Sequence, residues 1–565
     1  MKPTLLKSVC QSIILLTTLL FLAKPNMATT AVMLEDEQLI VNSRIILIGE
    51  VRYIKPQWDN NHQNIFTYVK IDISQVLKGE VQNSYVVLKQ LGGTIDEDST
   101  IIFGTPRYQI GQRVLLFLNT WSDGTLRVAH LFQGKYDVVE DKQARHSYIE
   151  RKVDSDKVNL LGVKESNKIT NSASLKQFTK KIQTILASKS AKVVAYESKY
   201  KETPIVEIPP EYLDESEENP GSGRITPQFT FLGSGFRWFE PDFGIPVSYQ
   251  INPSGAPLPS GGATQINQGL AAWTNVGTSS IVLQNIGFTS AVGFQADGVT
   301  AISYNDPLNQ IDDPVGCSGV LAIGGISRAS TQSTVINGKV FGRILEGDIV
   351  FNRFFECFLA IPANLAEVAC HEIGHTIGFN HTIVPTAIMR AFAYGNGRGA
   401  LLGLDDVTGV TFVYPQAGNP IDEARFFAGY LYRDFLNREP DFAGWDFWTS
   451  QLTLCGGEPN CVRGQRINVS TGFFTSTEFT SNKPALNPVF RGTPTYNQEF
   501  VLQCYRVYLR REPDPGGYNF WLSILQNNTP PGGLTPAAAY NIVLDGFLNS
   551  VEYRQRTFVR FGLNQ

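Results

Sequence analysis

One run near the middle of the chain constrains its fold and chemistry more than any other. From His371 to His381 the residues spell H-E-x-x-H-x-x-G-x-x-H. On a helix, positions i and i+4 lie on one face, so His371 and His375 point the same way with Glu372 beside them. Gly378 can end that helix in a left-handed conformation that most residues avoid, which turns the chain and returns His381 to the same place.

This pattern predicts a metal centre. Three imidazoles bind Zn²⁺ and leave its fourth position for water, which is the arrangement of a catalytic site. We predict that His371, His375 and His381 are the zinc ligands and that Glu372 is the catalytic base. The alternative is a surface helix with chance histidines. The chain has six histidines in 565 residues, so a match at five fixed positions argues against that alternative.

Further residues resemble the metzincin proteases. Met389 follows the third histidine at the distance of their Met-turn, and Thr382 with the run L-D-D-V-T-G-V-T-F-V-Y-P at 404–415 resembles the matrixin branch. The likeness spans about residues 225–415. It implies an α+β catalytic domain, with a twisted mixed sheet backed by helices, that hydrolyses peptide bonds.

The resemblance also implies roles for two other segments. G-D-I-V-F-N at 347–352 resembles the strand at the edge of the matrixin cleft, where an extended substrate backbone would pair. Asp405 and Asp406 lie where matrixins use an aspartate to tether the mature N-terminus or the Met-turn backbone. A helix N-cap explains either aspartate equally well.

The sequence departs from the animal matrixins in two ways. Residues 225–415 contain no histidine besides the three of the motif, so we expect no second zinc site. No cysteine lies between Ala31 and Cys317, so we expect no cysteine switch from the N-terminal side. The remaining likeness is to bacterial secreted proteases. Structural Ca²⁺ is a further expectation, with turn residues as the alternative reading; its candidate ligands are Asp297, Asn305, Asp306, Asp312, Asp313 and Asp348.

The start of the chain predicts export. Lys2 and Lys7 precede an apolar run, 13–23, that is too short to span a bilayer, so residues 1–31 read as a signal peptide. We therefore expect a secreted, extracellular protein with no membrane span. A net charge of −4 gives no reason to expect nucleic acid as a partner.

Composition and periodicity divide the remainder into four parts. Residues 32–165 carry alternating apolar runs and an Asp123-Gly124 hairpin signal, which predict an all-β barrel or sandwich. Residues 166–224 contain a helix, capped by Ser174, and then an acidic linker at 215–223. The protease domain follows at 225–418. The last part, 420–565, is predicted to be an all-α module.

That last part contains an internal repeat. Y-R-D-F-L-N-R-E-P-D-F-A-G-W-D-F-W (432–448) recurs as Y-R-V-Y-L-R-R-E-P-D-P-G-G-Y-N-F-W (505–521). It resembles the uncharacterised helical repeats of bacterial secreted and surface-layer proteins, which makes cell-surface or matrix association possible. We expect the two repeats to bury their aromatic residues against each other. A chain that ends near Asn419 should then stay folded and active.

Six cysteines follow the leader, and an exported chain permits disulfides. Cys455 and Cys461 flank a short loop and could close a local bridge. Cys317 and Cys357 resemble a recurrent pair of bacterial matrixin-like sequences. Cys370 precedes His371, but it is rotated by about 100° on the helix, which favours a buried thiol over a fourth ligand.

The expected function is that of a secreted zinc-dependent endopeptidase, in which a zinc-activated water attacks the peptide bond and Glu372 acts as general base. One alternative is a surface-anchoring or assembly protein whose helical repeats carry the function and whose protease domain is inactive. The intact Glu372 argues against it. Another is a hydrolase of a non-peptide bond, which Met389 and the matrixin-like helix disfavour.

Overall fold

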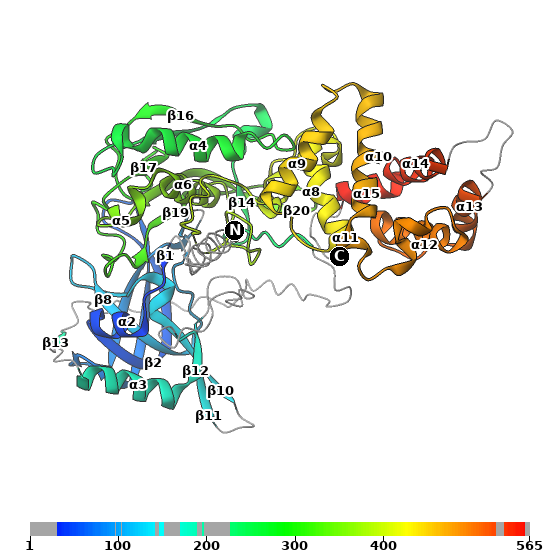
Figure 1. The fold of residues 1–565 in the computed structure, drawn as a ribbon. Coiled ribbons are helices and arrows are strands. Elements are labelled where there is room, and N and C mark those ends of the chain that lie inside the picture. Colours follow the sequence, from blue (N-terminus) through cyan, green and yellow to red (C-terminus); the bar gives the residue numbers. More distant parts are fainter. Residues whose placement is uncertain are drawn as a thin grey trace, which may run out of the picture.

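The computed structural model describes residues 31–96, 98–102, 104–141, 146–151, 170–188, 195–196, 226–391, 393–526 and 536–559. Residues 1–30 of the predicted leader and the acidic linker 215–223 lie outside these ranges. Figure 1 shows a β-rich N-terminal part, a middle part in which helices cover a sheet, and a helical C-terminal part. Within the described ranges, no helix is both long and apolar enough to cross a membrane.

The N-terminal part consists mainly of β-strands. Its sheet has the order β12-β11-β10-β8-β2-β3-β5-β9, and β9 pairs with β8 as well, so five of the strands close into a ring. The strands are β2 (Ile45–Trp58), β3 (Ile65–Lys78), β5 (Tyr85–Leu91), β8 (Arg113–Thr120), β9 (Leu126–Val128), β10 (Lys135–Asp141), β11 (His146–Glu150) and β12 (Ser172–Ser174).

Both faces of this sheet pack against apolar clusters, so a strand such as β2 carries buried apolar residues on both of its faces. Along β2, Ile46 and Ile48 belong to one buried cluster, and Ile45 and Leu47 belong to another, because successive side chains point to opposite faces. The predicted helix is present as α3 (Leu175–Ser188), which buries Phe178 and Ile182 in the first cluster and packs Leu175 and Ile185 against it. Ser174, the predicted cap, is the last residue of strand β12 and directly precedes the helix.

The middle part is built on a second sheet, of order β16-β15-β17-β20-β19-β7-β6. Its members are β15 (Val247–Ile251), β16 (Leu283–Phe288), β17 (Ala301–Ser303), β19 (Ala322–Ile336), β20 (Lys339–Phe351), β6 (Gly93–Ile95) and β7 (Asp98–Ile102). The first four strands in the order run parallel, and β19 and β7 are antiparallel to their neighbours. Helices α4 (Ala263–Thr274) and α6 (Pro362–Thr376) pack together, and Trp273 Nε1 donates to the carbonyl oxygen of Cys370 at 2.8 Å.

The prediction that 347–352 forms the cleft edge is wrong. Residues 347–351 belong to β20, which lies inside the sheet between β17 and β19. Strand β19 is the last strand that the middle part itself contributes, because β7 and β6 beyond it come from residues 93–102. A tight turn at Asn337 (φ 49°) and Gly338 (φ 82°) joins β19 to β20. An Asn-Gly pair with positive φ at both residues is the strongest short hairpin signal. It was the sequence signal that could have revealed β19.

The C-terminal part is helical, as predicted, and its two repeats have matching structures. In each repeat the E-P-D aspartate caps the following helix: Asp441 accepts from Gly444 N, and Asp514 accepts from Gly517 N. A turn with an N-cap therefore describes these motifs. The elements are α8 (Ala424–Leu431), η5 (Tyr432–Leu436), α9 (Phe442–Thr453), α10 (Pro459–Thr475) and α11 (Thr477–Thr480), then α12 (Pro494–Cys504), η8 (Tyr505–Leu509), α13 (Pro515–Gln526), α14 (Pro536–Leu548) and α15 (Val551–Val559).

The first repeat packs against the middle part through a buried charge. Arg433 in η5 is 1% exposed, and its guanidinium lies 3.6 Å from Asp405 and 2.7 Å from Glu439. It also donates to Thr408 in α7 (Leu404–Val413). One continuous apolar core runs from the middle part through both repeats. The repeats therefore bury surface of the middle part, beyond the mutual packing that the sequence suggested.

Both predicted disulfides form. Cys317 is bonded to Cys357, and Cys455 is bonded to Cys461. Cys370 is a buried free thiol, as expected, and Cys504 is another. The first disulfide ties the segment before β18 (Gly319–Val320) to the short helix α5 (Glu356–Leu359), which precedes the zinc-motif helix α6.

Arg433→Met tests the buried contact between the helical repeats and the middle part. Removal of the guanidinium leaves two buried carboxylates without their cation, which should lower the free energy of unfolding by about 3–5 kcal/mol. Urea unfolding measures this loss. The control is Arg425→Ala, because the partly exposed pair of Arg425 with Asp446 should contribute at most about 1 kcal/mol. Equal stabilities of the two variants would show that the repeats do not stabilise the middle part.

Candidate metal centre

Helix α6 positions the first two histidines. Pro362 occupies its first turn, where a missing N–H costs nothing, and the helix ends at Thr376. His371 and His375 lie one turn apart on a buried face and are 2% and 1% exposed. Gly374, between them, leaves room for Met389, since a Cβ at Gly374 would lie 2.1 Å from the Met389 sulfur.

The turn after the helix returns the third histidine. Gly378 has φ +103°, and a Cβ there would lie 2.1 Å from the carbonyl oxygen of Phe236, so glycine fits this position for two reasons. The Nε2 atoms of the three imidazoles then converge. His371 Nε2 lies 3.0 Å from His375 Nε2 and 2.9 Å from His381 Nε2, and the last two are 3.2 Å apart.

Backbone carbonyl groups fix the tautomers of two of these rings. His371 Nδ1 lies 2.7 Å from the carbonyl oxygen of Ile388, and His375 Nδ1 lies 2.8 Å from that of Phe379. A carbonyl oxygen can only accept, so each Nδ1 carries the proton and each Nε2 presents a lone pair. Two lone pairs 3.0 Å apart repel each other unless a cation lies between them.

The protonation state of the site suits a metal. Burial lowers the pKa of His371 to about 4 and lowers the pKa values of His375 and His381 well below their ordinary value. All three rings are therefore neutral near pH 7. Zinc–nitrogen bonds of about 2.0–2.1 Å at tetrahedral angles separate the nitrogens by about 3.3 Å. The observed separations fit this after an expansion of a few tenths of an ångström.

Asp406 supports the centre through the Met-turn. Its carboxylate accepts from Ile388 N at 2.6 Å, from Met389 N at 3.0 Å and from Gly403 N at 2.7 Å. Burial raises the pKa of Asp406 to about 7, although these amide donors oppose the rise. Because the Ile388 carbonyl orients His371, Asp406 holds one ligand indirectly. Of the alternatives that the sequence left open, Asp406 takes both: it holds the Met-turn backbone, and its bond from Gly403 N caps the start of α7 (Leu404–Val413).

Asp405 has a separate role. Its carboxylate accepts from Gln228 N at 2.7 Å, near the start of the described middle part, and it faces Arg433 of the first repeat. Burial raises its pKa to about 6, with Arg433 acting in the opposite direction. The aspartate pair thus secures two segments: the Met-turn by Asp406 and the chain around Gln228 by Asp405.

Glu372 belongs to helix α6, and its side chain lies against strand β19. It is 1% exposed. A Cβ added to Gly324 would lie 2.8 Å from Glu372 Oε2 and also 2.8 Å from the Glu372 carbonyl oxygen. The strand therefore passes directly over the predicted base, and a side chain at 324 would displace it. Sequence reasoning missed this strand and hence Gly324.

The carboxylates proposed for calcium are engaged with other groups. Asp348 and Asp306 accept backbone N–H groups, Asp312 pairs with Arg127, and Asp313 contacts Arg353. Across the described residues, the one group of three or more potential ligand side chains is His371, His375 and His381. These carboxylates act as turn-forming and ion-pairing groups.

The known proteins that the chain resembles bear on this centre. Residues 330–415 match the model of the matrixin family (Peptidase_M10), and residues 417–483 match a domain of unknown function, DUF4214. Metalloendoproteinase 5-MMP of Arabidopsis thaliana is 35% identical over 86 residues, which are 15% of this chain and 20% of that protein. The chain thus spans about a fifth of the length of this curated relative.

One solved structure is also similar. It is high choriolytic enzyme 1, a hatching enzyme zinc-protease from the medaka fish Oryzias latipes, with 13% sequence identity and a TM-score of 0.17. The match covers 32% of this chain and 94% of that one. So low a TM-score supports no conclusion about the fold.

The matrixin match includes β20, α6, the Met-turn and α7, and hence all three histidines, Glu372 and Asp406. The DUF4214 match covers the first helical repeat. The resemblance predicted from the sequence is therefore confirmed: the segment that carries the histidine triad is a matrixin-like metzincin, and a DUF4214 region follows it.

Proposed function

We propose that this chain is a secreted zinc endopeptidase. The observation that carries the proposal is the convergence of three buried imidazole Nε2 atoms, two of them with tautomers fixed by backbone carbonyls. The matrixin match over the same residues supports a zinc metalloprotease. His371, His375 and His381 would hold the metal, and the fourth position would remain open for water.

Glu372 is the proposed general base. A bound zinc lowers the pKa of a coordinated water toward about 7 and polarises the scissile carbonyl. Glu372, next to two of the histidines on α6, accepts the proton of the attacking water and then donates it to the leaving amine. Met389 packs beneath the helix against Gly374, which keeps the floor of the site apolar. Asp406 keeps the Met-turn and His371 in place.

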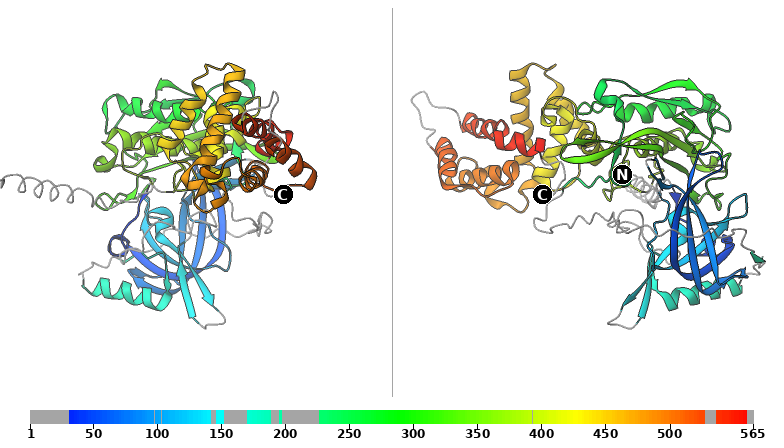
Figure 2. Two further views of the ribbon diagram at one scale, coloured as in Figure 1. Left: turned by 45° about the vertical axis from the view of Figure 1, so that its right-hand side comes forward. Right: turned by 180° about the vertical axis from the view of Figure 1, so that it is seen from behind.

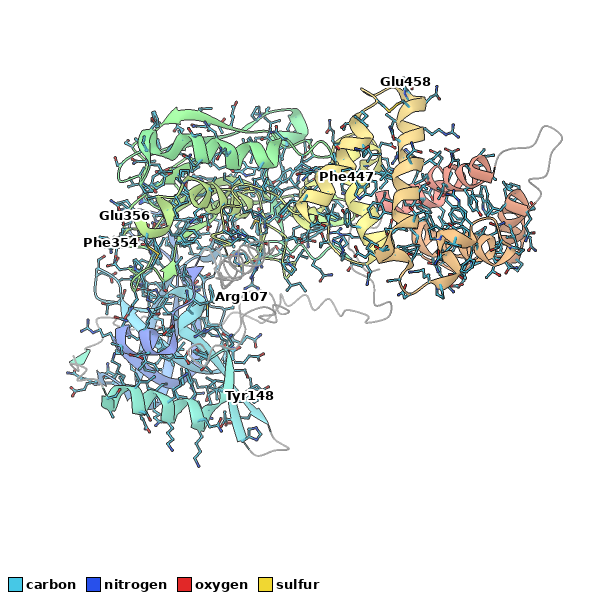
Figure 3. All side chains as sticks on the ribbon, viewed as in Figure 1. Arg107, Tyr148, Phe354, Glu356, Phe447 and Glu458 are labelled. Atoms are coloured by element: carbon cyan, nitrogen blue, oxygen red, sulfur yellow. A yellow bond between two sulfur atoms is a disulfide. The ribbon has the colours of Figure 1, made fainter. Side chains whose placement is uncertain are left out.

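The proposal extends to the setting of the enzyme. Export rests on the leader-like sequence at 1–31, and the two disulfides suit an oxidising compartment. Association with a cell surface or matrix through residues 420–565 rests on the helical repeats. These expose a phenylalanine at equivalent positions, Phe447 (labelled in Figure 3) and Phe520. Calcium has less support, because its candidate carboxylates are engaged elsewhere.

The competing proposal is an inactive protease domain that carries functional repeats. It predicts the same fold and leaves the zinc ligands without a catalytic purpose. The burial of Glu372 against Gly324, inside the triad region, favours a working centre.

Metal analysis tests the stoichiometry. Purified protein, after mild dialysis, should contain one zinc per chain, because the described residues bring together one group of three histidines. Inductively coupled plasma mass spectrometry measures this ratio. Two tightly held zinc ions per chain, or none after zinc loading, would contradict the assignment.

Glu372→Gln separates the base from the ligands. The variant should keep its zinc and its fold while peptide cleavage falls by at least about a hundredfold, since proton transfer is lost and three ligands remain. His381→Ala should weaken zinc binding itself. Cleavage of a peptide library, read by mass spectrometry, measures activity.

The matched control is Glu356→Gln, an exposed carboxylate at the start of α5 (Figure 3), which should cleave like the wild type. Both substitutions are compared in the Arg127→Ala background described below, where a Glu372→Gln variant that cleaves at a rate similar to this control would refute the role of Glu372 as base. An Arg127→Ala protein with Glu372 intact that holds zinc and cleaves no peptide would favour the inactive-domain alternative.

A further inference from the structure

Strand β19 is the last strand that the middle part contributes to its sheet, and it lies beside the metal centre. Strand β18 (Gly319–Val320), which precedes it directly, pairs with β1 in a separate two-stranded sheet. Gly324 of β19 lies against Glu372, and β20 pairs with the inner side of the strand. An exposed strand edge presents unpaired N–H and C=O groups that an extended peptide can bind by strand addition. This edge, rather than 347–352, is where an extended substrate would align with the zinc.

The N-terminal part pairs with this stretch of the middle part at two places. Strand β1 (Ala31–Val32) pairs antiparallel with β18, with Ala31 opposite Val320 and Val32 opposite Gly319. Strand β7 pairs antiparallel with β19, with Ile102 opposite Gly325, Ile101 opposite Ile326 and Ser99 opposite Ala329.

The pairing of β7 is close. A Cβ at Gly325 would lie 2.3 Å from the carbonyl oxygen of Ile101, so the two backbones come nearer than most side chains would allow. Thr100 Oγ1 donates to the carbonyl oxygen of Ser327 at 3.1 Å.

The free run between the two pairings is short. Val320 is the last residue that pairs with β1, and Gly325 is the first that pairs with β7, so residues 321–324 lie between the two pairings. Gly324 lies beside Glu372, so an extended peptide that pairs with this edge on both sides of the scissile bond extends onto Gly325 and the residues after it. It would therefore have to displace β7, which pairs with that run.

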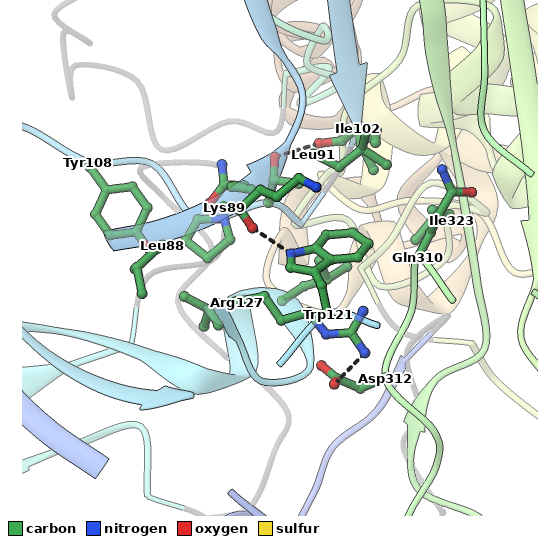
Figure 4. A pocket seen from close by; sticks show the side chains of 15 residues that line it. Leu88, Lys89, Leu91, Ile102, Tyr108, Trp121, Arg127, Gln310, Asp312 and Ile323 are labelled. Carbon is green, nitrogen blue, oxygen red and sulfur yellow. Dashed lines mark hydrogen bonds and ion pairs between the residues drawn. The ribbon is translucent and has the colours of Figure 1, made fainter. Parts of the chain in front are cut away.

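A buried ion pair secures this arrangement. Arg127 of β9 lies 2.9 Å from Asp312 of the middle part, and both side chains are less than 10% exposed. Asp312 also accepts from His130 N at 2.6 Å. His130 is itself buried, with 3% of its surface exposed. Figure 4 shows Arg127 and Asp312 in a pocket between the two parts, where Trp121 Nε1 donates to the carbonyl oxygen of Lys89.

Apolar contacts strengthen the same interface. Leu91, Ile102, Trp121 and Phe132 of the N-terminal part belong to the core cluster of the middle part. Figure 2 shows the N-terminal part against the middle part in two further views, with the helical repeats on another side of the molecule. The edge pairing is therefore part of a packed interface.

We propose that β7 occupies the substrate edge, so that the exported chain is latent toward extended peptides until its N-terminal part moves off β19. Of β1, Val32 lies beyond the predicted leader 1–31 and pairs with Gly319. This inference rests on the proposed peptidase function and adds its regulation. The occupant of the edge is a segment of the same chain, and the competing occupant is an extended polypeptide substrate. No cysteine is needed for this form of latency, and none is present between Ala31 and Cys317.

Two changes on the N-terminal side should open the edge. Arg127→Ala removes the buried partner of Asp312, and Ile101→Pro removes a backbone donor from β7. Each should raise chelator-sensitive cleavage of extended peptides at least about tenfold over wild type, because loss of the docking contacts enlarges the open population. The control is Arg52→Ala, which breaks an exposed ion pair within the same part and should leave cleavage unchanged.

A designed disulfide should close the edge again. Ser99 and Ala329 are opposite each other, and opposed residues of antiparallel strands have Cα atoms about 4.5–5.5 Å apart, within disulfide range. Ser99→Cys with Ala329→Cys, added to Arg127→Ala, should abolish the gain when oxidised and restore it on reduction. Arg127→Ala alone, with and without reductant, controls for the native disulfides.

A binding measurement makes the test independent of catalysis. In a Glu372→Gln background, a fluorescent peptide with the sequence Asp98–Thr105 should bind the reduced double-cysteine protein and not the oxidised one. Equal binding or equal cleavage in the two states would overturn the proposal. If binding differs between the states while no form with Glu372 intact cleaves peptides, the edge occupancy stands and the peptidase function fails.

Discussion

The metal centre depends on two backbone carbonyl groups. The oxygens of Ile388 and Phe379 hold the protons of His371 and His375 on Nδ1, which turns both Nε2 lone pairs toward the same point. Without a cation that arrangement is repulsive, and with one it is a ligand set. Each carbonyl is held in place by a different residue. Asp406 fixes the Met-turn that contains Ile388, and Gly378 allows the turn that places Phe379 beside His375.

The surroundings of the centre come from all three parts of the chain. The middle part supplies the ligands and Glu372. The first helical repeat supplies Arg433, whose charge faces Asp405, the neighbour of Asp406. The N-terminal part supplies β7 at the strand edge beside Glu372. A site that is compact in sequence, from His371 to His381, is thus enclosed by residues up to about 340 positions away.

The local chemistry could be predicted from the sequence, and the long-range contacts could not. The spacing of His371, His375 and His381 determines their geometry through one helix and one glycine turn, so the motif was sufficient. The assignment of Asp405 and Asp406 needed coordinates, because either could have been a cap. Strand β19 was not predicted because residues 330–334 in its second half are all polar. The Asn337-Gly338 turn that follows it was the sequence signal for this strand.

Contacts between parts left weaker traces in the sequence. Arg433 reads as part of a repeated motif, yet its counterpart Arg506 pairs with the exposed Glu512, so the repeat alone does not reveal that one arginine is buried against α7. The pairing of β7 with β19 joins residues more than 220 positions apart, and alternation predicts strands without predicting their partners.

X-ray absorption spectroscopy at the zinc edge tests the central claim most directly. The full-length protein loaded with one zinc should show three imidazole nitrogens at about 2.0–2.1 Å and one further oxygen ligand. That result would establish a three-histidine centre with an open position. A sulfur ligand at about 2.3 Å, which would indicate Cys370 or Cys504, or a first shell with fewer than three imidazoles, would contradict the account.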